Sequence, residues 1–292
     1  MKLIEKNLEK IQSFFMDSRY YPLSTHNTSS LNSLRSIHEI LLHAKEHRLI
    51  PQTTTLQHFS KFLVDNTILH QITLEIDKKV YTRYSINSEL DLFYFIKSIH
   101  ERGFFSMSTA LNMQGIIEYR PELIFFSNEL SKKEDNKEKL TQDKIDSAFK
   151  KKYRYTQKIT AVSNTKFTLI QLEPKHTNNY GVITTDQGFY VSSINRALVE
   201  MVVNIQYFND FQTLVNIFKP IKERLNIKDI VTIIEKFDFI YPYYNSIGFF
   251  LEELGFTKDE LLVIHQKISD LIFYTEKEKA HYQFNEYWKV YF

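Results

Sequence analysis

Residues 68–86, ILHQITLEIDKKVYTRYSI, contain two runs of alternating side chains. In the first run polar residues alternate with aliphatic ones, and the second run is rich in Tyr, Thr and Val. A period of two among β-branched and aromatic residues, interrupted by a short polar turn, predicts a β-hairpin. Because the turn reads Asp77-Lys78-Lys79, we expect a basic hairpin tip.

Three amphipathic segments precede this hairpin. Residues 3–16, 31–49 and 53–67 place apolar side chains three and four positions apart, which is typical of helices with one buried face. Pro51 separates the second segment from the third, and the threonines at 53–55 are suitable helix caps. The side chains expected to face inward are Leu34, Ile37, Leu41, Leu42 and Ala44 in the second segment, and Leu56, Phe59, Phe62 and Leu63 in the third.

Helices followed by a basic-tipped hairpin are typical of a winged helix-turn-helix. In that fold one helix enters the DNA major groove and the hairpin, or wing, contacts the backbone. The same pattern also fits any small α+β domain, and the polar helix face could simply be solvated. The DNA-binding residues predicted here are Thr53, Thr54, Thr55, Gln57, His58 and Lys61 on the third helix, with Lys78 and Lys79 on the wing.

The remainder of the chain predicts a second, mixed domain. A helix over 88–103 is followed by FFSMSTALNMQGI (104–116), where small residues allow a close-packed helix that Gly115 can end in the left-handed conformation. Strand patterns then alternate with turns, and the chain is mostly helical from about 193. We therefore expect an α+β protein, with a winged helix-turn-helix at 1–86 and a mixed α/β, largely helical C-terminal domain at 87–292.

The helix that begins in LTQDKIDSAFKKKYRYTQK (140–158) has a basic end. One interpretation is a solvated helix terminus, since the helix dipole favours cations there. The other is a second phosphate-binding patch flanked by tyrosines, which suits nucleic acid. On the second interpretation, the DNA-binding residues also include Lys150, Lys151, Lys152 and Arg154.

Several kinds of chemistry find no support in the sequence. The absence of cysteine removes disulfides, thiolate zinc sites and cysteine nucleophiles. There is no Gly-Lys-Ser/Thr phosphate loop and no Gly-x-Ser-x-Gly elbow, and His38 and His43 stand on different faces of a helix. No apolar run reaches the length of a membrane span. We expect no enzymatic activity, cofactor or metal, no membrane partner, and a cytoplasmic location.

The order of segments resembles the AbiEi family of antitoxins from type IV toxin–antitoxin systems. The stretches that carry the resemblance include LDLFYFIKSIHERGFFSMSTALNMQGI, GFYVSSINRALVEMVV and FDFIYPYYNSIGFFLEELGF, over roughly residues 30–256. Family motif positions correspond to Phe105, Ser106, Thr109, Ala110, Leu111 and Gly115, and to Ser193, Arg196, Ala197 and Leu198. Asn195 departs from the family, which often has Glu there, and so does the segment 204–211, where a glycine-containing turn is usual.

The resemblance implies a winged helix that binds operator DNA and represses its own operon. It also implies a C-terminal domain that neutralises a cognate nucleotidyltransferase-like toxin, with or without direct contact, in phage defence. The alternative is a protein-interaction subunit of a phage-defence complex without DNA binding. Residues 1–86 hold 11 Lys or Arg against 8 Asp or Glu, a small excess that leaves this alternative open. Its interface could use Tyr241, Tyr243, Tyr244, Phe249 and Phe250, although helical spacing also suits them to a core.

Overall fold

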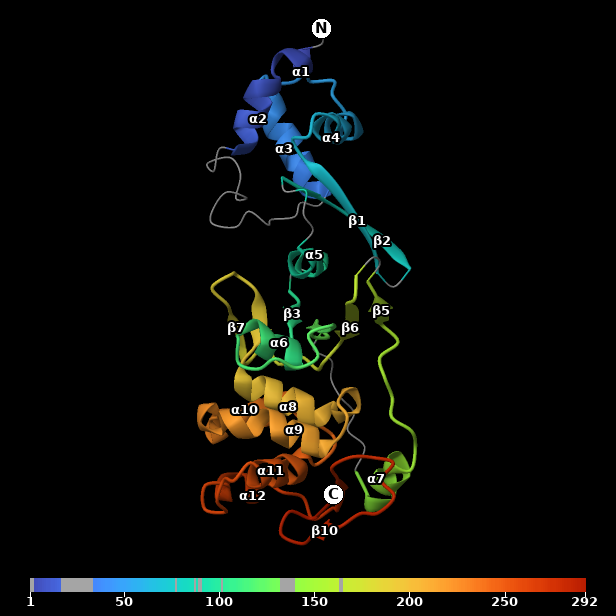
Figure 1. The fold of residues 1–292 in the computed structure, drawn as a ribbon, viewed down its shortest axis with the longest axis vertical. Helices are drawn as coiled ribbons and strands as arrows, with labels where there is room; N and C mark the ends of the chain where they lie inside the picture. Colours follow the sequence, from blue (N-terminus) through green and yellow to red (C-terminus); the bar gives the residue numbers. More distant parts are fainter. Residues whose placement is uncertain are drawn as a thin grey trace. The chain divides into compact units, whose positions relative to one another are not determined.

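The structure is a computed structural model that describes residues 3–16, 34–76, 78–86, 88, 91–100, 102–131, 140–162 and 165–292. It is a mixed α/β structure that divides into two compact units (Figure 1). Unit 1 comprises Met1–Arg102 with Val162–Thr165, and unit 2 comprises Gly103–Ala161 with Lys166–Phe292. In the described part of the chain, no helix is long and apolar enough to cross a membrane.

Unit 1 contains the predicted helices and hairpin. Aliphatic side chains from the first four helices pack with Phe59 and Tyr84 into one core, and Ile37, Ile40, Phe59 and Leu63 are almost completely buried. Leu42 was expected on the buried face of the second predicted helix, which is wrong, because 52% of its surface is exposed. The elements are α1 (Leu3–Lys6), α2 (Leu8–Met16), α3 (Leu34–Glu46), α4 (Leu56–Asp65), β1 (His70–Ile76), β2 (Lys79–Ser85) and α5 (Leu92–Ile99).

The predicted hairpin is confirmed, with β1 and β2 antiparallel and Ile76 opposite Lys79. In β1 Gln71, Thr73 and Glu75 are exposed, while Leu74 and Ile76 are buried, as the alternation predicts. In β2 the alternation fails, because burial increases steadily from the tip to the base. Val80, near the tip, is 67% exposed.

Helix α5 belongs to unit 1, whereas the sequence-based boundary at 86/87 assigned it to the C-terminal domain. The Arg83 side chain of β2 donates to both the hydroxyl and the carbonyl of Ser98 in α5, each at 2.8 Å. The guanidinium also lies 5.9 Å from the centre of the Phe95 ring. These contacts tie α5 to the hairpin that precedes it in the chain.

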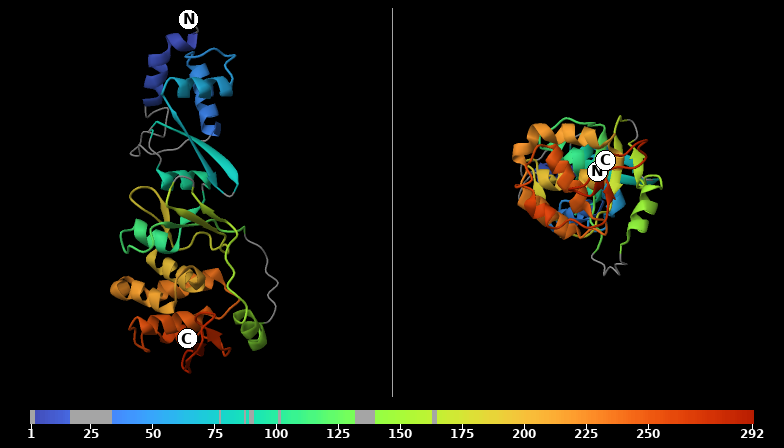
Figure 2. Two further views of the ribbon diagram at one scale, coloured as in Figure 1. Left: turned by 45° about the vertical axis from the view of Figure 1, so that its right-hand side comes forward. Right: turned by 90° about the horizontal axis from the view of Figure 1, so that it is seen from below.

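Unit 2 contains a six-stranded mixed sheet of order β5-β6-β4-β3-β8-β7, with helices stacked beyond it (Figures 1 and 2). Strands β4 and β6 are parallel, as are β3 and β8, and the other pairs are antiparallel. The strands are β3 (Phe104–Phe105), β4 (Leu123–Ser127), β5 (Ile159–Ala161), β6 (Thr168–Leu172), β7 (Val182–Thr184) and β8 (Tyr190–Ser192). The strand patterns in the sequence predict β4 to β8, which are confirmed, whereas β3 lies in the stretch 104–116 and was not predicted.

Helix α8 is the centre of unit 2, because every residue from Asn195 to Val202 is buried. It contacts α6 and β8 on the sheet side and α9, α10 and α11 elsewhere. The helices are α6 (Met107–Met113), α7 (Gln142–Phe149), α8 (Ile194–Val203), α9 (Phe211–Phe218), α10 (Ile227–Phe237), α11 (Tyr243–Glu253) and α12 (Leu262–His265), with 3-10 turns η2 (Ile205–Tyr207) and η3 (Lys219–Arg224).

The small-residue helix predicted within 104–116 is confirmed as α6. Its residues Met107 to Leu111 are buried, and Thr109 donates to the carbonyl of Leu123 while accepting from the amide of Phe125. Gly115 has φ 63°, and a Cβ there would meet nothing within 4 Å. Glycine is therefore suited to this position because it adopts the left-handed backbone conformation that ends the helix. It is not needed to make room for a neighbouring element.

A three-stranded sheet at the C-terminus was not predicted from the sequence. Its strands β9 (Phe273–Tyr274), β10 (Phe284–Asn285) and β11 (Val290–Tyr291) each have two residues and form the order β10-β11-β9. Two residues cannot show a period of two, so such strands leave no pattern to find. The last third is helical, as expected, up to α12.

Arg196 of α8 joins the sheet to the helices through an ion network whose charged side chains are buried. Its guanidinium donates to Glu129 at 3.0 Å and to Glu200 at 2.7 Å, and none of its side chain is exposed. The guanidinium also lies 4.6 Å from the centre of the Phe104 ring and 5.0 Å from that of Phe237. Paired and hydrogen-bonded charges of this kind are stable only while all partners remain.

We expect this network to weaken in acid. Burial raises the pKa of Glu129, but hydrogen bonds from Thr177, Asn179 and Arg196 more than offset that effect, so its pKa lies below the usual 4.5. A depressed carboxyl pKa stabilises the fold above the unfolded-state value and loses that contribution as pH falls through the folded-state value. In urea titrations, the stability difference between wild type and Glu129→Gln should therefore shrink below pH 4.5. A difference independent of pH would contradict this assignment.

Candidate functional sites

The first candidate site is the outer face of α4 in unit 1. Thr55 is the N-cap of this helix, and its hydroxyl accepts the amide hydrogen of His58 at 3.2 Å. The predicted outward-facing residues Gln57, His58 and Lys61 are exposed, while Phe59 and Leu63 face the core. Thr53 is also exposed and Thr54 is half-buried. The helix thus presents donors and acceptors along one side, and Thr55 additionally serves the fold as a cap.

The hairpin tip of unit 1 carries the predicted wing residues. Lys78 and Lys79 are both exposed, and Lys78 has a left-handed φ of 60° at the turn. Within the described ranges, no carboxylate lies within 4.0 Å of the amine of Lys61, Lys78 or Lys79. Unpaired amines on an exposed surface are available for phosphate contact.

The predicted basic run of unit 2 begins where α7 ends. Lys150 is the C-cap residue, and Lys151, Lys152 and Arg154 follow in the non-helical segment after it. All four side chains are exposed. Only Lys150 therefore stands at the helix terminus, so the dipole interpretation applies to it and not to the other three.

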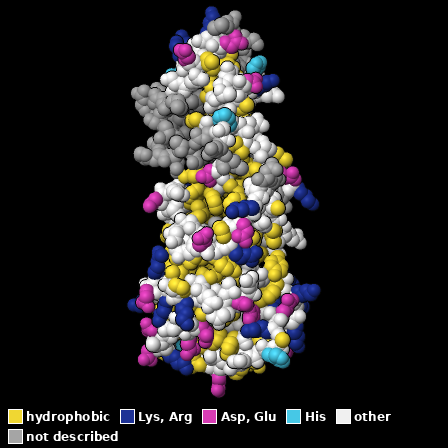
Figure 3. All heavy atoms as spheres, in the orientation of Figure 1, with side chains coloured by type: hydrophobic (Ala, Val, Ile, Leu, Met, Phe, Trp, Pro, Cys, Tyr) yellow, Lys and Arg dark blue, Asp and Glu magenta, His cyan; other side chains and the backbone are white. Residues whose placement is uncertain are grey.

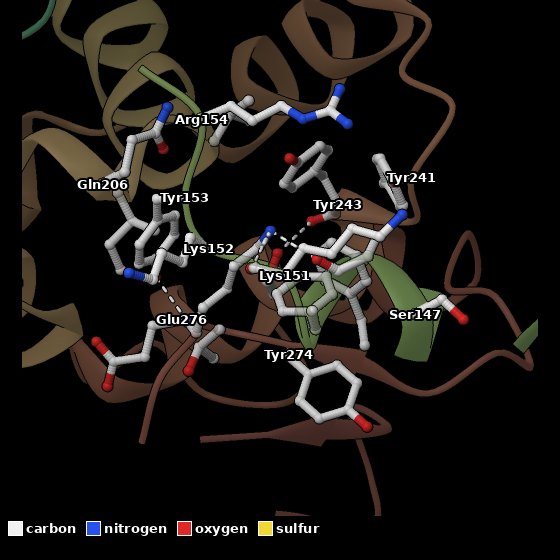
Figure 4. Close-up of a pocket in the computed structure, with 18 of the residues that line it drawn as sticks. Ser147, Lys151, Lys152, Tyr153, Arg154, Gln206, Tyr241, Tyr243, Tyr274 and Glu276 are labelled. Carbon is white, nitrogen blue, oxygen red and sulfur yellow. Dashed lines mark hydrogen bonds between the residues drawn. The ribbon is translucent and has the colours of Figure 1, made fainter. Parts of the chain in front are cut away.

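The residues after α7 line the second candidate site, a pocket of about 630 Å³ that we call the α7 pocket (Figure 4). Lys151, Lys152 and Arg154 contribute to one part of its wall, and the Arg154 side chain extends above Tyr243 in the view of Figure 4. Tyr153 of the same segment also lines the pocket, and other segments supply tyrosines and polar groups. These are Gln206, Tyr241, Tyr243, Tyr274, Thr275, Glu276 and Lys277.

Lys277 connects the C-terminal segment to the residues that end and follow α7. Its ammonium donates to the carbonyls of Ala148, at 2.7 Å, and Lys151, at 3.2 Å, and its amide donates to the Tyr153 hydroxyl at 2.6 Å. Burial lowers the pKa of Lys277, and the positive charges of Arg154 and Lys151 lower it further. Burial also raises the pKa of Tyr153 to about 12, so its hydroxyl stays neutral near pH 7. The pocket is therefore electropositive, with neutral phenols in its wall.

The aromatic residues considered above for a protein interface differ in their surroundings. Phe249 and Phe250 are buried in the unit 2 core, where they pack against Phe211. Tyr241 and Tyr243 are half-buried and line the α7 pocket. Tyr244 is also half-buried, and burial raises its pKa to about 12.

On the face of unit 2 shown in Figure 3, acidic and basic side chains are intermingled.

Sequence reasoning missed Gln206, Thr275 and Lys277 as pocket residues. They lie far from the basic run in the chain and belong to no motif. The only available signal was the mixture of lysines with tyrosines at 150–155, which marked one side of the pocket.

Comparison with known proteins gives a fold but no family. No family model matches the sequence, and no curated protein matches it. Among solved structures, the chain is similar to the crystal structure of the RV2827C protein from Mycobacterium tuberculosis. The TM-score is 0.57 at 8% sequence identity, and the match covers 98% of this chain and 91% of that one. At this identity, the similarity shows a shared fold alone.

Proposed function

We propose that this chain is a DNA-binding regulator in which unit 1 is a winged helix. The observation that carries the proposal is that unit 1 contains both a capped helix and a hairpin. The helix, α4, has an exposed polar face, and the β1–β2 hairpin has exposed lysines at its tip. In this proposal α4 enters the major groove and the hairpin contacts the backbone. Gln57 and His58 would read base edges, and Lys61, Lys78 and Lys79 would contact phosphates.

We propose further that the chain represses its own operon and neutralises a cognate nucleotidyltransferase-like toxin. Support comes from the AbiEi resemblance, whose motif residues Thr109 and Arg196 are both buried in unit 2. A buried motif is explained by packing, so the toxin-neutralising surface is not assigned to these residues. DNA contact by Lys150, Lys151, Lys152 and Arg154 stays a prediction.

The DNA-binding face can be tested with the double variant Lys61→Ala, Lys78→Ala. Each lost phosphate contact should lower the slope of log affinity against log salt by about 0.9, so we expect affinity for the chain's own upstream DNA to fall about 10- to 100-fold. Gel shifts at several salt concentrations measure both quantities. The matched control is Lys228→Ala with Lys236→Ala, two exposed lysines on α10 of unit 2.

Unchanged affinity and salt slope in the first double variant would show that this face does not bind DNA. The same full-length variant should still protect cells that express the neighbouring toxin gene, if repression and neutralisation use different surfaces. If instead the wild-type protein binds no upstream DNA yet still protects, the interaction-subunit alternative is favoured.

A further inference from the structure

The α7 pocket combines three features that proteins use to hold a phosphorylated, ring-containing ligand. Its volume of about 630 Å³ lies within the range of small-molecule sites. Five lysines and arginines line it, against two carboxylates, an excess of three positive charges. Four tyrosines contribute aromatic surface: Tyr153, Tyr241, Tyr243 and Tyr274.

Of the two carboxylates that line the pocket, Glu276 already has protein partners, and Asp143 lies in solvent. Glu276 is buried, and it accepts the amide hydrogen of Phe211 at 3.1 Å and pairs with Lys279 at 2.8 Å. Asp143 is exposed. By contrast, within the described residues no carboxylate lies within 4.0 Å of the charged groups of Lys151, Lys152 or Arg154. Cations gathered without counter-charges attract an anion.

A buried hydroxyl in the same wall also lacks a partner. Thr275 is only 6% exposed and lines the pocket, and no polar atom of the described chain is within hydrogen-bonding distance of its Oγ1. An unsatisfied buried hydroxyl is unusual in a folded protein and is costly. Because less than 1 Å² of this oxygen is accessible in the free protein, a ligand in the α7 pocket reaches it only by displacing the surrounding wall.

We propose that the α7 pocket binds a free nucleotide. Lys151, Lys152 and Arg154 take the phosphates, since ammonium and guanidinium groups form charge-assisted hydrogen bonds with phosphate oxygens. The tyrosines contact the base, and Thr275 and the Gln206 amide hydrogen-bond to base or sugar. This inference does not depend on DNA binding by unit 1, because every residue it uses belongs to unit 2.

Calorimetry on the full-length protein tests the proposal with four probes: ATP, inorganic tripolyphosphate, adenosine and a single-stranded oligonucleotide. We expect ATP to bind with a Kd below about 1 mM, and tripolyphosphate and adenosine each to bind at least about ten-fold more weakly, because each offers half of the contacts. GTP and UTP in place of ATP then report which base the pocket prefers.

Two variants separate binding from folding. Lys152→Ala with Arg154→Ala should weaken ATP binding about ten-fold or more, while Lys228→Ala with Lys236→Ala leaves it unchanged. Thr275→Val keeps the shape of the side chain and removes only the unpartnered hydroxyl. It should weaken ATP binding while the melting temperature stays the same or rises, since the free protein loses an unsatisfied group.

Three results would overturn the proposal. One is no heat of binding with ATP at about 1 mM, and the second is equal affinity for tripolyphosphate and ATP, which would make the pocket an anion site only. The third is binding of the oligonucleotide without binding of any free nucleotide, which would make it part of a strand-binding surface. None of these results bears on the gel shift with upstream DNA.

Discussion

Replacing Arg196 with methionine is expected to destabilise unit 2 by about 3–5 kcal/mol. The substitution removes the guanidinium that two buried carboxylates, Glu129 and Glu200, share, so both keep other hydrogen-bond donors but lose this counter-charge. Glu200 also accepts the hydroxyl of Ser192 at 2.7 Å and the amide of Met107 at 3.3 Å, so the loss would extend to the start of α6. The measurement is urea unfolding followed by the fluorescence of Trp288, the single tryptophan, which lies in unit 2.

The triple variant Arg196→Met, Glu129→Gln, Glu200→Gln is the control for this prediction. It removes all three charges at once, so no unpaired ion is left in the interior, and much of the lost stability should return. If the single and triple variants are equally destabilised, the cost lies in lost packing against Phe104 and Phe237 and not in the uncompensated charges.

The second large effect is expected from Gly248→Ala. Within a helix, alanine is normally favoured over glycine by about 1 kcal/mol, so a sequence-based argument gives the opposite sign. In the structure, a Cβ on Gly248 would stand 2.1 Å from Cζ3 of Trp288, whose side chain is fully buried. The indole cannot move aside freely, because its Nε1 donates to Glu252 and the main-chain carbonyl of Trp288 accepts from the Asn245 amide at 3.0 Å.

We therefore expect Gly248→Ala to cost about 3 kcal/mol and to displace Trp288 toward solvent. A red shift of tryptophan emission at zero denaturant and a lower urea midpoint would report the two effects. The rescue variant adds Trp288→Leu, and its stability is followed by circular dichroism. The double variant should be more stable than Trp288→Leu alone if steric overlap is the cause, since the helix then gains alanine without the clash. A wild-type midpoint for Gly248→Ala would show that α11 and the C-terminal segment are not packed this tightly.

Elements that depend on local sequence were predictable. The hairpin of β1 and β2, helices α3 and α4, and the helix ended by Gly115 were each encoded by periodicity, a cap or a required backbone angle within about ten residues. The outward placement of Gln57, His58 and Lys61 followed from helical spacing alone. Leu42 is an exception, because helical spacing identifies an apolar face but not whether another element covers every residue of that face.

Features that depend on contacts between distant segments were decided only by the tertiary structure. The α7 pocket joins Arg154 to Gln206, Tyr243 and Thr275, which share no motif. The unpartnered hydroxyl of Thr275 exists only because the surrounding chain excludes water from it. From the sequence, Gly248 is only an unfavourable residue for a helix, whereas in the structure Trp288 occupies the space that a larger side chain would need. The physical reason is the same in each case: sequence periodicity reports which side of an element is apolar, whereas burial, pairing and steric fit depend on which other elements pack against that side.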